Sequence, residues 1–130
     1  MADLNVAVVS SERSLWQGTA RSVVAKTPEG EIGILAGHEP VLALLVEGPL
    51  RVETTDGTKV VVAVHGGFFS VAKDEVKVIA EVAELAEDID VERAKAALAA
   101  AKSASEEDTS AIHRAETRLT VAAAAKPLTR

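Results

Sequence analysis

Residues 83–94, with the sequence AELAEDIDVERA, divide the chain into two parts of different composition. Before this stretch Val is frequent, and Gly and Pro recur at short intervals. After it Gly is absent, Ala dominates, and the next Pro is Pro127. Val-rich sequence with frequent turn residues indicates strands, whereas Ala-rich sequence without Gly or Pro indicates helices. We therefore predict an α+β chain, with a β domain in residues 1–85 and a helical part in residues 86–130.

The first part has the pattern of a series of short strands. Leu4, Val6 and Val8 alternate with smaller or polar residues, as in a strand with one buried face. Asp56-Gly57 lies between two such segments, and this pair favours a hairpin with a type I′ turn. Further strands are predicted at 20–26, 31–35, 41–46, 50–54, 58–64, 68–72 and 76–80. Because no helical pattern separates these strands, we predict an antiparallel β-sandwich or barrel.

The second part has the pattern of two helices. Asp88 and Asp90 offer side-chain oxygens for capping a helix that begins near Val91. Residues 103–108 are polar and are predicted to separate this helix from the next one, which gives an antiparallel hairpin. The predicted apolar stripes are Val91, Ala94, Leu98 and Ala101 in the first helix, and Ile112, Ala115, Leu119, Ala122 and Ala123 in the second. Since these residues are mostly Ala, we expect the hairpin to be only weakly held on the sandwich.

Composition excludes several classes of function. The net charge of −6 disfavours binding to nucleic acid or to anionic lipid. Without Cys, the chain has no thiolate metal site and no cysteine nucleophile. The histidines, His38, His65 and His113, lack partners at ligand spacing, so we predict no metal site. There is no catalytic motif, and Gly66-Gly67 is predicted to form a turn or bulge where backbones approach closely.

No segment of 18 apolar residues and no signal-peptide pattern is present, so we expect any membrane association to occur through a partner.

One group of charged residues suggests a ligand. Arg114 and Arg118 stand four residues apart on one helix, a spacing at which like charges repel unless an anion lies between them. In a folded hairpin Arg93 could join them around a phosphate or a partner's carboxylate. The alternative is that the arginines are solvated or paired with Glu92, Glu107 and Glu116.

The order of sandwich and hairpin, together with several motifs, identifies a family. Residues 29–40, EGEIGILAGHEP, resemble the signature of the epsilon subunit of bacterial F-type ATP synthases. Similar matches occur at Leu4–Ser10, Trp16–Gly18, Val64–Phe68 and 83–90. The resemblance implies an N-terminal antiparallel β-sandwich followed by a C-terminal helical hairpin, in a central-stalk subunit that couples proton-driven rotation to ATP synthesis and has no catalytic site of its own. It implies binding to the gamma subunit, the c-ring and the alpha/beta hexamer, at the cytoplasmic face of the plasma membrane.

The resemblance also implies roles for individual residues. In the segment that the family presents to the ring, the matching residues are Glu29, Glu31, Gly37 and His38; Ala36 and Glu39 depart from the usual Pro and Ala.

In the hairpin, residues 89–94 are similar to a nucleotide motif of some bacterial members, in which ATP is a regulatory ligand and not a required cofactor. The matching ATP-binding residues here are Glu84, Ile89, Asp90, Arg93, Ala94, Arg114 and Arg118, whereas Ala100 replaces a basic residue. The hairpin is then expected to inhibit ATP hydrolysis. A different hypothesis is a free-standing ATP-sensing module with the same fold, and a small hydrolase is a third.

Overall fold

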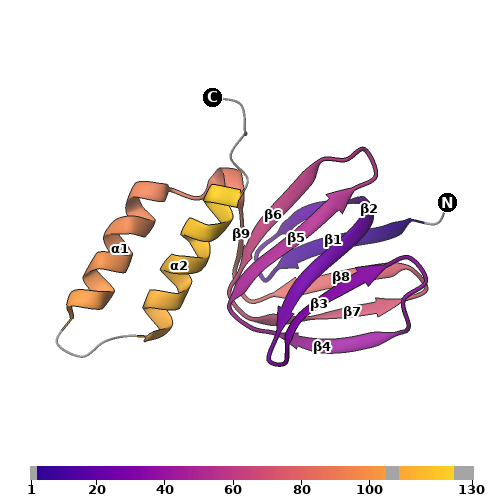
Figure 1. Ribbon diagram of the computed structural model, residues 1–130, viewed down its shortest axis with the longest axis horizontal. Helices are drawn as coiled ribbons and strands as arrows, with labels where there is room; N and C mark the ends of the chain where they lie inside the picture. Colours follow the sequence, from indigo (N-terminus) through magenta and orange to yellow (C-terminus); the bar gives the residue numbers. More distant parts are fainter. Residues whose placement is uncertain (1–2, 105–108, 125–130) are drawn as a thin grey trace.

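The structure is a computed structural model, which describes residues 3–104 and 109–124. A domain of nine strands is followed by two helices, which confirms the predicted α+β class with a sandwich and a helical hairpin (Figure 1). The strands are β1 (Leu4–Ser10), β2 (Ser14–Thr27), β3 (Gly30–Leu35), β4 (Val41–Leu45), β5 (Gly48–Thr54), β6 (Lys59–Val64), β7 (Gly67–Ala72), β8 (Glu75–Ala80) and β9 (Ala83–Leu85). A 3₁₀ turn η1 (Ala86–Asp88) leads to α1 (Val91–Ser103) and α2 (Thr109–Ala124).

The long strand β2 connects the two layers of the sandwich. Its first half pairs with β1, and its second half pairs with β3 on one side and β5 on the other. The hydrogen-bonded order is β4-β7-β8-β1-β2-β5-β6-β9, with β3 attached to β2. Most pairs are antiparallel as predicted, but β1 and β8 are parallel, which the local patterns did not indicate. The first half of β2 and the short strand β9 were also not predicted.

The core of the sandwich consists almost entirely of aliphatic side chains. Its largest fully buried members are Phe69, Leu4, Ile34 and Leu50. Leu4, Val6 and Val8 are all buried, which confirms the alternation predicted for β1.

Two turns differ from what their sequences indicate. The β5–β6 hairpin is present, but only Gly57 of the Asp56-Gly57 pair has positive φ, so the predicted type I′ turn is wrong. Instead the side chain of Asp56 accepts hydrogen bonds from the Thr54 hydroxyl and the Thr58 backbone, which lower its pKa to about 2. Two consecutive positive φ angles occur at Lys73 and Asp74, between β7 and β8, although this dipeptide is a weaker signal for such a turn.

The helical hairpin lies against one side of the sandwich, with α2 between α1 and the strands (Figure 1). Asp90 caps α1 as predicted, because its side chain accepts from the backbone N–H of Arg93. Asp88 does not cap α1, since it belongs to η1. The predicted cap of α2 falls within residues 105–108, outside the described residues.

The apolar stripe of α2 is only partly as predicted. Ala115 and Ala122 are buried, but Ala123 is exposed. Thr117 and Val121, which the predicted stripe did not include, are buried instead. This difference arises because α2 has two neighbours, α1 and the sheet of β5 and β6, so its buried surface is wider than one stripe.

Candidate functional site

A hollow of about 380 Å³ lies where β9, η1, α1 and α2 meet. Its size is within the range of sites for small ligands. Of the seven residues predicted to bind ATP, five line it: Glu84, Asp90, Arg93, Ala94 and Arg118. Asp88 and Ala97 complete the lining.

The other two predicted residues lie elsewhere. Ile89 is buried in a small apolar cluster with Val61, Ala63, Val121 and Ala122, so its side chain joins the hairpin to the sandwich. Arg114 is partly exposed on α2 and is not among the residues that line the hollow. The structure therefore brings together Arg93 and Arg118, but not the predicted group of three arginines.

Arg118 makes a short polar contact between the hairpin and the sandwich. Its Nε donates to Oε1 of Glu84 at 2.6 Å, which joins α2 to β9. Within residues 3–104 and 109–124, no other ion pair connects a hairpin helix to a strand of the sandwich. The alternative pairing of the arginines with Glu92 and Glu116 is not observed: Glu92 contacts Lys95 at 3.8 Å, and the pairing with Glu107 lies outside the described residues.

Glu84 also binds His65, which lies directly after β6. Nε2 of His65 is 3.0 Å from the same Oε1 of Glu84, and its Nδ1 is 2.7 Å from Oε2 of Glu47. The side chain of His65 is only 4% exposed. Glu47, His65, Glu84 and Arg118 thus form a continuous chain of polar side chains, which we call the Glu47–Arg118 chain.

This environment stabilises the ionised form of Glu84. Burial alone would raise the pKa of Glu84, but hydrogen bonds from Arg118 and His65 and their positive charge outweigh it, so the pKa lies below its ordinary value of 4.5. Because the carboxylate is paired in the folded state, its contribution to stability is present above pH 4.5 and is lost as the pH falls below that value.

Apolar contacts between the hairpin and the sandwich are few. In the small cluster around Ile89, α2 contributes Val121 and Ala122. Full burial of a Val side chain stabilises by roughly 1.5 kcal/mol or somewhat more, and Ala contributes less. A hydrogen bond to a charged group contributes about 1.5–3 kcal/mol. The Glu84–Arg118 pair is therefore comparable to the apolar contacts in holding α2.

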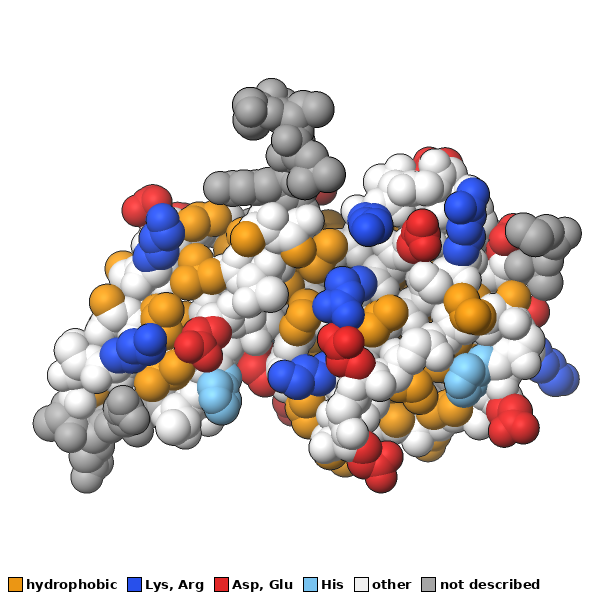
Figure 2. Space-filling model, in the orientation of Figure 1, with side chains coloured by type: hydrophobic (Ala, Val, Ile, Leu, Met, Phe, Trp, Pro, Cys, Tyr) orange, Lys and Arg blue, Asp and Glu red, His pale blue; other side chains and the backbone are white. Residues whose placement is uncertain are grey.

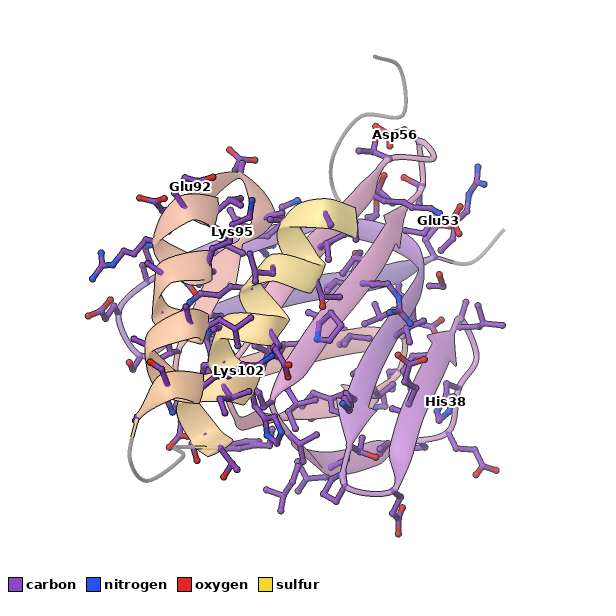
Figure 3. All side chains as sticks on the ribbon, turned by 60° about the vertical axis from the view of Figure 1, so that its left-hand side comes forward. His38, Glu53, Asp56, Glu92, Lys95 and Lys102 are labelled. Carbon is purple, nitrogen blue, oxygen red and sulfur yellow. The ribbon has the colours of Figure 1, made fainter. Side chains whose placement is uncertain are left out.

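The four residues predicted to contact a ring lie along β3. Glu29, Glu31 and Gly37 are exposed, and His38 is partly buried. They are not in a single loop, because the six residues of β3 separate Glu29 from Gly37. Glu31 also pairs with Arg51 of β5 at 2.9 Å. His38 lies across the strands from α1, whose Glu92, Lys95 and Lys102 mark the other side of the molecule (Figure 3).

A second surface feature is apolar and exposed. Leu44 of β4 pairs with Phe68 of β7, which in turn pairs with Ile79 of β8, so the three side chains form a row across three strands. Leu42 and Leu44 are 75% and 65% exposed, and β4 is the last strand in its layer. We call Leu42, Leu44, Phe68 and Ile79 the outer apolar patch. Exposed apolar groups of this kind mark binding surfaces.

Neither His65 and Glu47 nor the outer apolar patch was identified from the sequence. One signal for His65 is its place in an alternating series: Val61 and Ala63 face the hairpin, and His65 is the next residue on that side. For the patch, the signal is Leu42-Ala43-Leu44-Leu45, which is apolar on both faces of a short strand.

The surface shows no concentration of one charge on the face seen in Figure 2, where acidic and basic side chains are interspersed. In the part of the chain that the structure describes, no group of three or more His, Asp or Glu side chains could hold a metal ion. No helix among the same residues is long and apolar enough to cross a membrane.

Comparison with known proteins places the chain in a family. The model of the beta-sandwich domain of the ATP synthase delta/epsilon chain matches residues 3–86. The ATP synthase epsilon chain of Streptomyces griseus subsp. griseus is 49% identical over 118 residues, which are 91% of this chain and 94% of that protein. The epsilon chain of Rhodococcus opacus is 57% identical over 100 residues, or 76% of this chain and 82% of that protein.

Among solved structures, a chain of the Euglena gracilis mitochondrial ATP synthase, solved as OSCP/F1/c-ring, has a TM-score of 0.74 and 28% identity. The match covers 95% of this chain and 79% of that one. Because the family model spans most of the chain and the match covers 94% and 82% of the two relatives, the chain belongs to the family of ATP synthase epsilon chains, which are accessory subunits of that complex and not its catalytic ones.

Proposed function

We propose that this chain is a rotor subunit in the central stalk of an F-type ATP synthase, at the cytoplasmic face of the plasma membrane. In this role the sandwich binds the gamma subunit and the c-ring and helps to couple proton-driven rotation to ATP synthesis. The hairpin inhibits ATP hydrolysis when it leaves the sandwich and extends toward the alpha/beta hexamer. The observation that carries the proposal is the contrast between a well-packed sandwich and a hairpin held by few contacts.

The sandwich offers two surfaces for these partners. The outer apolar patch is suited to gamma, because burying it would remove exposed Leu and Phe side chains from water. The outward face of β3, with Glu29, Glu31, Gly37 and His38 at or beyond its ends, remains the predicted contact with the ring. Such a contact would extend along the strand, about 20 Å for six residues.

Removal of the hairpin tests the inhibitory role. A chain truncated after Asp88 keeps every strand of the sandwich, so we expect it to assemble normally. ATP hydrolysis by the assembled complex should rise several-fold, because the inhibitory element is gone. The measurement is the hydrolysis rate of purified complexes with equal subunit content. Equal rates for the truncated and complete chains would show that the hairpin is not an inhibitor.

The hollow between α1, α2 and β9 supports ATP as a regulatory ligand. Arg93 and Arg118 offer donors for phosphate, and the carboxylates of Glu84, Asp88 and Asp90 offer acceptors for hydroxyl and amino groups of a nucleoside. Among the described residues, the terminal nitrogens of Arg118 have no partner, since Glu84 occupies only Nε. These donors and acceptors support a nucleotide as the ligand of the hollow.

ATP should stabilise the docked hairpin. A ligand that binds only the docked form contributes about 2.7 kcal/mol at about a hundredfold excess over its dissociation constant. We expect ATP at millimolar concentration to raise the melting temperature. Arg93→Met should weaken ATP binding about tenfold, since a hydrogen bond to a charged group is lost. Its stability without ATP should be nearly unchanged, because Arg93 is exposed.

Calorimetry and thermal shift of the isolated chain measure both effects. Lys102→Met is the matched control, because Lys102 lies at the far end of α1 and does not line the hollow. A melting temperature that stays constant through a millimolar ATP titration would exclude the ATP site. If the chain instead binds ATP but never associates with gamma, the free-standing ATP sensor would be the better description.

A further inference from the structure

In the Glu47–Arg118 chain, one oxygen of Glu84 accepts hydrogen bonds from both the sandwich and the hairpin. Oε1 of Glu84 accepts from Nε2 of His65 at 3.0 Å and from Nε of Arg118 at 2.6 Å. His65 belongs to the sandwich, and Arg118 belongs to the hairpin. The position of this oxygen, and so the pairing of Arg118, therefore depends on His65.

His65 is itself fixed from its other side. Its Nδ1 contacts Glu47 at 2.7 Å, and its backbone N–H donates to the carbonyl of Val82 at 2.9 Å. A neutral imidazole has one N–H, so two ionised carboxylates can both accept from the ring only when the ring carries two protons. The ring of His65 therefore joins Glu47 on one side to Glu84 on the other, and Glu84 is shared with Arg118.

We propose that His65 and Glu47 are positioning residues for the hairpin, which hold the Glu84 carboxylate where Arg118 of α2 binds it. Docking of the hairpin then depends on His65 and Glu47 of the sandwich as well as on Arg118 of α2. This inference rests on the proposed function, in which the hairpin exists in docked and extended forms.

Other charged groups surround the cluster from each neighbouring element. On the side of Glu84, the hollow of about 380 Å³ that Arg118 lines is also lined by Asp88, Asp90 and Arg93. On the side of Glu47, a second hollow of about 460 Å³ between β5 and α2 is lined by charged or titratable side chains from the sandwich and the hairpin. These are Lys26, Glu31, Arg51, His113 and Glu116. Each hollow contains cationic side chains as well as carboxylates, so their charges largely cancel. Neither hollow therefore has an excess of positive charge that could take over the role of His65 beside Glu84.

A double-mutant cycle tests the proposal in the full-length chain. Hydrogen exchange of the α2 amides measures the equilibrium between docked and open hairpin, and urea unfolding followed by the fluorescence of Trp16 reports the sandwich separately. Arg118→Met should lower the docking equilibrium constant about tenfold, and so should His65→Gln. In the Arg118→Met background, His65→Gln should change docking by less than about twofold, because the two residues act through the same oxygen.

The same experiment has a matched control and a pH dependence. Lys59→Gln changes an exposed residue of β6 that lines neither hollow, and docking should stay as in the parent chain. Docking should also weaken as the pH falls from 4.5 through the lowered pKa of Glu84, because protonation removes the carboxylate that Arg118 binds, and this part of the pH dependence should disappear in Glu84→Gln.

Equal losses from His65→Gln with and without Arg118 would overturn the proposal, since His65 would then act only through general stability. No effect of His65→Gln on docking would overturn it as well. The proposed function is tested independently: if the cycle shows coupling but the truncated chain does not change ATP hydrolysis, the positioning role of His65 stands and the inhibitory role of the hairpin fails.

Discussion

Replacing Gly67 by Ala is expected to lower the free energy of unfolding by at least about 3 kcal/mol. Gly67 has a φ of +135°, a conformation that residues with a side chain rarely adopt. A Cβ atom there would lie 2.3 Å from the carbonyl oxygen of Ile79 and 2.7 Å from Cα of Ala80. Both obstacles are backbone of β8, so relief requires the β7–β8 pair to separate, and β8 also pairs with β1.

Two other glycines serve as controls for this substitution. At Gly57 an alanine must adopt a φ of +89°, but its Cβ has no atom within 4 Å. Gly57→Ala should therefore lower the free energy of unfolding by only about 1–2 kcal/mol. Gly33 has no positive φ, and a Cβ there has no atom within 4 Å. Gly33→Ala should therefore change the free energy of unfolding by less than about 0.5 kcal/mol. Urea unfolding, followed by Trp16 fluorescence, measures all three. If Gly67→Ala costs no more than Gly57→Ala, the backbone contact with β8 has no energetic consequence.

Replacing Leu44 by Asp is expected to weaken binding to the gamma subunit at least about a hundredfold. Leu44 lies within the outer apolar patch, next to Phe68. In a complex that covers this patch, the new carboxylate would be buried without a partner, which is far more costly than the loss of the leucine contacts. The folded chain should be little affected, because Leu44 is already 65% exposed.

Co-purification with gamma measures this effect, and fractionation shows whether the chain remains with the membrane complex. Lys59→Asp is the control, because it introduces the same carboxylate at an exposed position of β6 outside the patch. Normal association of Leu44→Asp with gamma would mean that this partner binds elsewhere on the sandwich. Urea unfolding of both variants confirms that any loss of binding is not a loss of folding.

Local sequence patterns predict most of this fold. The alternation in β1, the glycine turns and the change of period near residue 85 each depend on neighbouring residues, and the structure has elements at those places. The parallel pairing of β1 with β8 could not be predicted in this way, because it joins Asn5 to Glu75 through space. The positive φ angles of Lys73 and Asp74 were not predicted for a different reason. The pairing of β7 with β8 on both sides of this turn imposes its backbone angles, whatever its two residues prefer.

The candidate site was only partly predictable. Motif similarity indicates Glu84, Asp90, Arg93, Ala94 and Arg118, which do line one hollow. It does not indicate the contact between His65 and Glu47, which lie 18 residues apart and are brought together at the open end of the β5–β6 hairpin, where Gly48 pairs with Val64. Nor does it reveal that Arg118 already has a carboxylate partner, whereas Arg114 has no ion pair among the described residues.

The parallel pairing of β1 and β8 has a consequence for synthesis of the chain. β1 can pair with β2 soon after both leave the ribosome, but its other edge stays open until β8 has been made. A nascent chain therefore exposes an unpaired, Val-rich edge through most of translation, which favours pairing with other chains. Once β8 is available, the sandwich lacks only β9, so it can close while the hairpin is still being translated. The hairpin then meets a completed surface, and its helices can fold onto the sandwich without taking part in its formation.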